Sequence, residues 1–288
     1  MNPGEISITV LSDNHAAFGL EVEHGFSLWI EIPGCNILFD TGQSAAMLNN
    51  AESLGVMLST TDIIAISHGH YDHTGNIAEV LRRAPQAEIY LHEAALCERY
   101  SIHEAPRRIG MPEPSVEAIR GLAPDRLHAV AGLTIIADGV WVTGPIPRLT
   151  SGEDTGGPFY LDAEGRHLDH ISDDLALWIE TSEGLVVCLG CCHSGIINTL
   201  NYIARLTGDR PIVSVIGGMH LCHASDARYL FTANALKEYS MQLLIPCHCT
   251  GDTACSYLAE KLGSIVHQGF AGMKQTFHTQ GNHEEDSK

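Results

Sequence analysis

The sequence predicts an α/β protein with four layers, an αββα sandwich in which two mixed sheets lie face to face and helices cover their outer sides. Two observations favour this fold class. Short apolar runs alternate with helical stretches along the chain, and each half begins with strands and continues with strand–helix units. Because no linker-like stretch divides the chain, we expect one domain over residues 1–278 and a polar tail over residues 279–288.

The elements of the first half follow from apolar runs and the turn signals between them. Pro33 and Gly34 indicate a hairpin turn between two strands, and Gly55 is placed to end a helix. The expected strands lie at residues 6–11, 26–32, 35–39, 62–67 and 88–91, and the expected helices at residues 44–54 and 76–84.

The middle of the chain, residues 93–170, is less regular and rich in Pro, Gly, Arg and His. We expect it to be an irregular insertion that contributes to the functional site, with short strands near residues 133–137 and 140–143. Regular elements return in the second half. Strands are expected at residues 175–180, 185–189, 212–216 and 243–246, and helices at residues 196–206, 226–239 and 254–262.

The composition excludes several classes of protein. The chain has 35 acidic and 16 basic side chains and a formal net charge of −19, which argues against nucleic acid as the main partner because phosphate contacts need clustered Lys and Arg. An apolar fraction of 44% with 18% charged residues is typical of a globular protein. No run of 18 or more apolar residues suggests a membrane span, and the first residues do not resemble a signal peptide. We therefore expect a cytoplasmic protein.

The nine cysteines are expected to be reduced and buried. Their number is odd, most lie in apolar segments, and a chain of this size needs no disulfide framework. Cys188 and Cys191 have the spacing of a zinc knuckle, but no second pair at a suitable distance completes four ligands. We interpret this pair as the end of a strand with a structural role.

The residues that carry chemistry follow the apolar strand at residues 62–67. His68, His70 and His73 lie within six residues together with Asp72, and neutral imidazole and carboxylate suit Zn²⁺, Fe²⁺ or Mn²⁺. His68 and His70 are two residues apart in an extended segment, so their rings can point to the same side. Asp72 and His73 can reach a second position, and Gly69 lets the backbone bend. A solvated histidine-rich loop is the alternative, but this density of ligands at a strand end favours a site for two metal ions.

The pattern His-x-His-x-Asp-His after an apolar strand resembles the metallo-β-lactamase superfamily, and the resemblance extends through most of the chain. Three further segments match it: residues 39–42 with Asp40, residues 190–195 with His193, and residues 246–251 with His248. The resemblance implies the four-layer fold and a dinuclear centre. It implies that His68, His70 and His193 hold one metal ion and that Asp72, His73 and His248 hold the second. Asp40 would orient the histidine loop by hydrogen bonding.

The sequence departs from the family pattern at one place. A bridging Asp is expected near residues 216–221, but that segment contains no carboxylate, and Asp226 downstream is better interpreted as the start of a helix. His220 is therefore a substituting ligand or a group facing the substrate, with a hydrogen-bonded core histidine as the alternative. Because a neutral imidazole cannot bridge two cations, the identity and occupancy of the second metal stay open.

A narrower branch of the superfamily is also indicated. The chain resembles the metal-dependent hydrolases named after the 7,8-dihydropterin-6-methyl-4-(β-D-ribofuranosyl)-aminobenzene-5′-phosphate synthase. The segments that carry this resemblance are residues 12–14, 143–148, 173–177, 190–195 and 217–221. Neither level of resemblance fixes a substrate.

The cofactors that the resemblance implies are two divalent ions, zinc first, with iron or manganese as alternatives. Two neighbouring cations would lower the pKa of a shared water and polarise the bond under attack. We expect Asp72, His220 and Asp13 to be the catalytic groups, with Asp13 and His220 as proton carriers, although Asp13 could equally cap a turn with Asn14.

The substrate is expected to be a small anion, phosphorylated or pterin-like. Arg148 lies in a proline-framed loop and could bind a phosphate, as could His220, although a surface arginine is the common alternative. Arg107 and Arg108 could add weaker contacts. The helix that begins near Gly195 is expected to direct free N–H groups toward the site.

Three hypotheses about function follow. The first is a metal-dependent hydrolase of a small phosphate or ester. The second is a transferase that joins a dihydropterin diphosphate to an arylamine ribose phosphate. The third is a non-catalytic metal-binding sensor. A diiron redox enzyme would need a flavin-binding partner domain, which is not found in this sequence, and a homo-oligomer stays open.

Overall fold

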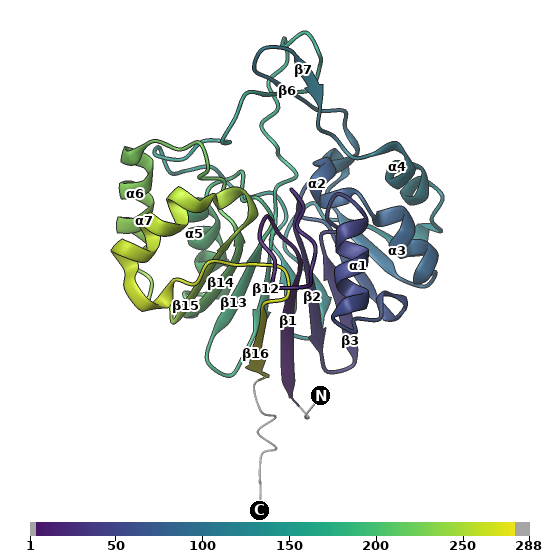
Figure 1. Cartoon of the computed structure of the whole chain (residues 1–288), viewed down its shortest axis with the longest axis horizontal. Coiled ribbons are helices and arrows are strands. Elements are labelled where there is room, and N and C mark those ends of the chain that lie inside the picture. The colour runs from purple at the N-terminus through teal and green to yellow at the C-terminus, as the bar shows by residue number, and fades with distance from the viewer. Residues whose placement is uncertain (1–3, 280–288) are drawn as a thin grey trace, which may run out of the picture.

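Two β-sheets pack face to face in the computed structural model, which describes residues 4–279, and helices cover their outer sides (Figure 1). The predicted four-layer αββα sandwich is confirmed. The expected polar tail at residues 279–288 lies outside the described residues, apart from Thr279.

The first sheet contains seven strands in the order β16-β1-β2-β3-β4-β5-β8. Strands β16, β1, β2 and β3 pair antiparallel, whereas β3, β4, β5 and β8 pair parallel. The bounds are β1 Glu5–Ser12, β2 Ser27–Ile32, β3 Cys35–Phe39, β4 Ile63–Ala65, β5 Glu88–Leu91, β8 Leu127–Ala129 and β16 Lys274–His278. Both outer strands, β8 and β16, are missing from the sequence prediction.

The second sheet contains six strands in the order β15-β14-β13-β12-β10-β9. Only β13, β14 and β15 run parallel to one another; the remaining pairs are antiparallel. The bounds are β9 Thr134–Ala137, β10 Val140–Val142, β12 Ala176–Glu180, β13 Leu185–Leu189, β14 Ile212–Gly218 and β15 Leu243–Cys247. All six strands correspond to predicted ones.

Apolar side chains from both sheets form the central core, which includes Ile8, Ile30, Leu177 and Val186. Helices α1, α3 and α4 pack against the outer side of the first sheet, and α5, α6 and α7 against that of the second (Figure 1). The helices are α1 Ala45–Ser53, α2 Tyr71–Thr74, α3 Ile77–Arg83, α4 Glu113–Arg120, α5 Ile196–Thr207, α6 Asp226–Leu236 and α7 Asp252–Leu262. None of the helices in residues 4–279 combines the length and apolar character that crossing a bilayer requires.

The middle of the chain is more ordered than its composition suggests. It contributes α4, β8 and a small separate sheet with the strand order β11-β6-β7. These strands are β6 Tyr100–Ile102, β7 Pro106–Arg108 and β11 Phe159–Tyr160. The hairpin of β6 and β7 stands above the carboxyl ends of the main strands (Figure 1). The expectation of an irregular insertion is therefore only partly right.

The parallel strands bring the chemically active segments to one end of the sandwich. The loops after β3 and β4 carry Asp40 and the histidine loop, and the loops after β13, β14 and β15 carry His193, His220 and His248. Parallel strands place their carboxyl ends at the same edge of a sheet, where ligands bind in many α/β proteins. A hydrogen bond from the Leu175 N–H to the Ser67 carbonyl, 3.0 Å long, ties the two sheets together at this edge.

Glycine is needed in the histidine loop for space rather than for an unusual backbone angle. A Cβ atom on Gly69 would lie 2.1 Å from the carbonyl oxygen of Ala95, and Gly69 does not have a positive φ. The expected role of Gly69 in a tight bend is thus replaced by a close approach between two backbone segments.

Candidate metal centre

Three buried histidines meet between the two sheets. The ligand atoms of His68, His70 and His193 all lie within 4.8 Å of one another, although 120 residues or more separate His193 from the other two in sequence. The rings of His68 and His193 have centroids 4.8 Å apart, and those of His70 and His193 are 4.9 Å apart. Burial lowers the pKa of all three well below the usual histidine value, so the neutral form that binds metal ions prevails.

The outer nitrogen of the key histidines is held by a hydrogen-bond partner. His193 Nδ1 lies 2.8 Å from the Thr155 carbonyl oxygen, His248 Nδ1 lies 2.8 Å from Asn14 Oδ1, and His73 Nδ1 lies 2.7 Å from Asp40 Oδ2. In each ring Nε2 is left to point inward. This is the arrangement that surrounds metal-bound histidines, where the partner fixes the tautomer and the ring orientation.

Inward nitrogens of this cluster lack a hydrogen-bond partner among the described residues. His70 Nε2 and His193 Nε2 are buried and make no hydrogen bond, and His248 Nε2 has only the Asp72 carboxylate nearby, 3.3 Å away. Leaving a buried nitrogen unpaired costs about 1–3 kcal/mol. A cation between these rings would offset that cost, so the donor set fits a divalent metal ion.

Asp40 connects the histidine loop to the first sheet. Its carboxylate accepts hydrogen bonds from the Ser67 N–H (2.7 Å) and the Ser67 hydroxyl (2.6 Å), and it holds His73. Asp40 has a φ of 58°, a left-handed conformation that is rare outside glycine. These contacts are of the kind expected for a residue that orients the ligands.

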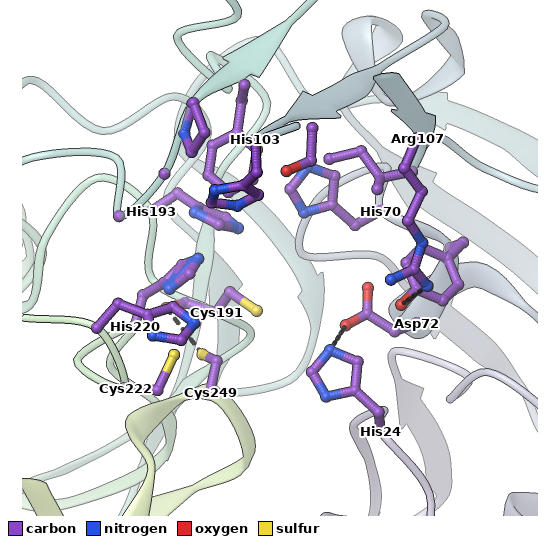
Figure 2. A pocket seen from close by; sticks show the side chains of 18 of the residues that line it. His24, His70, Asp72, His103, Arg107, Cys191, His193, His220, Cys222 and Cys249 are labelled. Atoms are coloured by element: carbon purple, nitrogen blue, oxygen red, sulfur yellow. Dashed lines mark hydrogen bonds and ion pairs between the residues drawn. The ribbon is translucent and has the colours of Figure 1, made fainter. Parts of the chain in front are cut away.

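The residues expected at the second metal are only partly grouped as the resemblance implies. Asp72 Oδ2 lies 3.3 Å from His248 Nε2 and 3.2 Å from the half-exposed His24 (Figure 2). His73 instead directs Nε2 toward Cys191 Sγ, at 3.0 Å. Burial would raise the pKa of Asp72, but the charges and hydrogen bonds of His73, His24 and His248 lower it well below its usual value.

Two cysteines belong to this region, and sequence reasoning missed both. Cys191 groups with His68 and His73, and it also groups with His248 and Cys249. The sequence predicted a purely structural role for Cys191 and did not predict that its thiol lies among the candidate metal donors. Two signals could have revealed it: each cysteine lies within two residues of a predicted ligand, and the bridging carboxylate is missing.

His220 faces the same cavity but belongs to none of the ligand groups found among the described residues. Its ring centroid is 4.3 Å from that of His193, and its Nδ1 has no hydrogen-bond partner there. Burial lowers its pKa to about 3, so the ring is neutral at ordinary pH. A place facing the substrate, rather than a ligand position, fits these contacts.

Asp13 and Arg148 do not line this cavity. The Asp13 carboxylate accepts the backbone N–H groups of His248 (2.8 Å) and His15 (3.0 Å), so it holds the backbone of His248 in position, and burial raises the pKa of Asp13 to about 7. The Arg148 guanidinium donates to the carbonyl oxygens of His193 and His170. The functional atoms of both side chains thus contact the backbone, and the expected catalytic role of Asp13 and phosphate-binding role of Arg148 stay predictions.

The amino terminus of α5 is also occupied. The carboxylate of Glu153 accepts the N–H groups of Ile197 (3.0 Å) and Asn198 (2.7 Å), and Asp174 accepts that of Ser194 (2.7 Å). The expectation that this helix offers free N–H groups to a substrate anion is therefore wrong.

A buried ion pair joins the insertion to the histidine loop. Arg99 is 1% exposed and lies 2.5 Å from Asp173 Oδ1 and 3.2 Å from Asp169 Oδ2. The second oxygen of Asp173 accepts the Gly69 N–H at 2.7 Å. None of these three side chains was predicted to support the site.

The cluster opens into a cavity of about 820 Å³ that the insertion partly covers (Figure 2). His24, Asp72 and His70 line one side, and His103 and Phe159 come from the insertion. Arg107 is the only Arg or Lys among the described residues that line it. Its guanidinium donates to the Tyr71 hydroxyl at 2.9 Å and lies 5.2 Å from the centre of that ring.

Comparison with known proteins gives consistent matches. The sequence pattern of the metallo-beta-lactamase superfamily matches residues 20–167. The 7,8-dihydropterin-6-methyl-4-(beta-D-ribofuranosyl)-aminobenzene-5'-phosphate synthase of Methanocaldococcus jannaschii is 26% identical over 290 residues, which cover 94% of this chain and 98% of the synthase. An uncharacterized protein of the same organism, MJ0448, is 32% identical over 88% of this chain and 94% of its own length.

Solved structures agree with the sequence matches. The crystal structure of Tm1679, named as a metal-dependent hydrolase of the beta-lactamase superfamily, superposes with a TM-score of 0.80 at 31% identity, covering 94% of this chain and 98% of Tm1679. A diphosphatase from the PhnP family has a TM-score of 0.57 at 13% identity, covering 96% of this chain and 98% of its own, and this likeness concerns the fold alone.

Replacing Asp40 by Asn should weaken metal binding by about 10–100-fold if His73 holds a metal ion as predicted, because His73 loses the carboxylate that orients it. The measurement is a competition titration of Zn²⁺ against a chromogenic chelator. Asp62→Asn is the matched control, since Asp62 accepts a backbone N–H at the opposite end of β4, away from the cluster. Equal affinities of the two variants would contradict the role assigned to Asp40.

Proposed function

This chain belongs to the metallo-beta-lactamase superfamily, and from that premise we propose that it is a metal-dependent enzyme that hydrolyses a small phosphorylated substrate. The observation that carries the proposal is the set of buried histidines whose outer nitrogens are held while their inner nitrogens converge. Such an arrangement is costly in an empty protein and favourable around a cation.

The proposal assigns donors on this chain to two ions. His68, His70 and His193 would hold the first ion, and Asp72, His73 and His248 would contribute to the second. When bound, divalent ions supply Lewis-acid chemistry: they make water a better nucleophile near neutral pH and polarise the oxygen of the bond under attack. Zinc fits this mixed set of imidazole and carboxylate donors, as do iron and manganese.

The chain's own residues would bind and orient the substrate. Arg107 can contact a phosphate, because its side chain lines the cavity and an exposed guanidinium binds phosphate oxygens in pairs. The neutral ring of His220 can accept or donate a hydrogen bond beside the ligand His193. The cavity volume suits a substrate of the size of a nucleotide or a pterin conjugate.

The second candidate is a transferase that joins a dihydropterin diphosphate to an arylamine ribose phosphate. The similarity to the synthase over 94% of the chain favours it, and Phe159 and Tyr71 offer aromatic surfaces in the cavity for a planar ring.

Water labelled with heavy oxygen separates the two reactions. Hydrolysis should place the label in one of the products, whereas transfer to an arylamine should release unlabelled diphosphate. Mass spectrometry of the products makes the measurement, with phosphomonoesters, phosphodiesters and a pterin diphosphate plus arylamine as the substrates offered. Unlabelled products from every phosphate ester would contradict the hydrolase.

His68→Ala and His193→Ala should each lose most of the bound metal and nearly all activity, because each removes a donor of the first ion. Elemental analysis and turnover are measured on the same samples. His128→Ala is the matched control, since His128 pairs with Glu88 on the first sheet and does not line the cavity. If a variant loses its metal and its activity but the biological role persists in cells, that role does not depend on metal catalysis and the metal-dependent enzyme is contradicted.

Arg107→Ala should raise KM by about 10–100-fold with a smaller change in kcat, because a hydrogen bond from a charged donor contributes about 1.5–3 kcal/mol to binding. Steady-state kinetics with the phosphorylated substrate identified in the screen provide the measurement. Arg108→Ala is the control from the same strand, as Arg108 faces Glu98 and Glu113 instead of the cavity. A similar KM in both variants would exclude Arg107 as a substrate contact.

A further inference from the structure

Two thiols lie where this chain lacks a bridging carboxylate. Cys191 follows β13 after a single glycine and is 3% exposed, and Cys249 follows His248 and is 5% exposed. The segment at residues 216–221, where a bridging Asp would stand, contains no carboxylate. The centre thus has room for a further anionic donor.

The position of Cys191 is unlike that of a core cysteine. Its Sγ lies 3.0 Å from Nε2 of His73, the nitrogen left free by the bond to Asp40. It forms one group of close donors with His68 and His73 and a second group with His248 and Cys249. Cys191 is the one cysteine that belongs to two of the donor groups found in the described residues, and it therefore lies between the two halves of the cluster. Figure 2 shows its sulfur directed toward the side of the cavity that carries Asp72.

We propose that Cys191 is a metal ligand of this centre, binding the second ion as a thiolate beside His73 in place of the missing bridging carboxylate. The inference rests on the proposed function in so far as the histidine cluster binds divalent ions. As the metal–sulfur bond forms, the thiol proton leaves to solvent, and the thiolate supplies the single negative charge that an Asp would have supplied. Sulfur donors favour Zn²⁺ and Co²⁺ over Mg²⁺ and Ca²⁺.

Cys249 belongs to only one of these donor groups, that of Cys191 and His248, and we assign it a different task. Its Sγ lies 3.6 Å from the backbone carbonyl oxygen of Cys191, so it holds the backbone that carries the ligand. A Cβ atom on Gly218 would lie 2.5 Å from the Gly190 carbonyl oxygen and 2.7 Å from this sulfur, so both contacts favour glycine there. Cys192 is the natural comparison, since its Sγ contacts the hydroxyl of Thr199 in α5 at 3.3 Å and points away from the cluster.

The test is the absorption spectrum and metal content of the full chain loaded with Co²⁺. Thiolate coordination to Co²⁺ produces an intense charge-transfer band in the near ultraviolet, which imidazole and carboxylate ligands do not produce. The native protein should show this band with two bound equivalents. Cys191→Ser should lose the band and one equivalent, whereas Cys249→Ser and Cys192→Ser should keep the band.

A variant with a carboxylate at position 191 separates the effect of the negative charge from that of the sulfur. Cys191→Asp should recover the second equivalent without the band, because it restores the charge but not the sulfur. Loss of the band in Cys249→Ser, or its persistence in Cys191→Ser, would overturn the assignment. The native, Cys249 and Cys192 proteins decide the matter even if Cys191→Ser does not fold.

The same data distinguish this inference from the proposed function. If Co²⁺ binds and gives only the weak visible bands of imidazole and carboxylate coordination, Cys191 is not a ligand and the metal-dependent enzyme stands. If the native protein binds no Co²⁺, both proposals fail.

Discussion

The hydrogen bonds to the outer nitrogens of the buried histidines are the constraint on which the centre depends. Without them, rings that lie between two sheets could flip and satisfy their inner nitrogens on nearby backbone. With Thr155, Asn14 and Asp40 in place, His193, His248 and His73 are held with Nε2 facing inward. The fold thereby directs several imidazole nitrogens into its interior, and a divalent cation would satisfy them together.

Backbone strain collects at the same end of the sandwich. Asp40, Cys192, His220 and His248 all have positive φ, each directly after or near the end of a strand. Residues other than glycine hold such conformations at a cost of about 1–3 kcal/mol when the surrounding structure enforces them. Here the close-packed strand ends and the hydrogen bonds between the sheets enforce these conformations. As a result, side chains from five loops point toward the same cluster.

The sequence predicted the features of this protein that depend on residues close together in the chain. The fold class, most strands of both sheets and the histidine loop after β4 all depend on patterns of a few residues, and the start of a helix at Asp226 is confirmed. Short edge strands such as β8 and β16 were missed because their alternation of exposed and buried residues is too brief to recognise. Cys191 was misread because its neighbour His73 lies 118 residues away in sequence and comes from the other sheet. The partners of Arg148 and Asp13 are also distant in sequence, because Arg148 contacts the backbone of His193, 45 residues away, and Asp13 that of His248, 235 residues away.

The β6–β7 hairpin is one short continuous segment of the chain, whereas the candidate metal donors come from strand ends spread over both halves. The hairpin above the cavity is therefore separate in sequence from the loops that carry the candidate donors. A few insertions or substitutions in the β6–β7 hairpin can change which molecules fit the cavity, while the two main sheets keep their geometry. Relatives that share the two main sheets need not share a substrate, because the hairpin above the cavity can change while the strand-end loops stay the same.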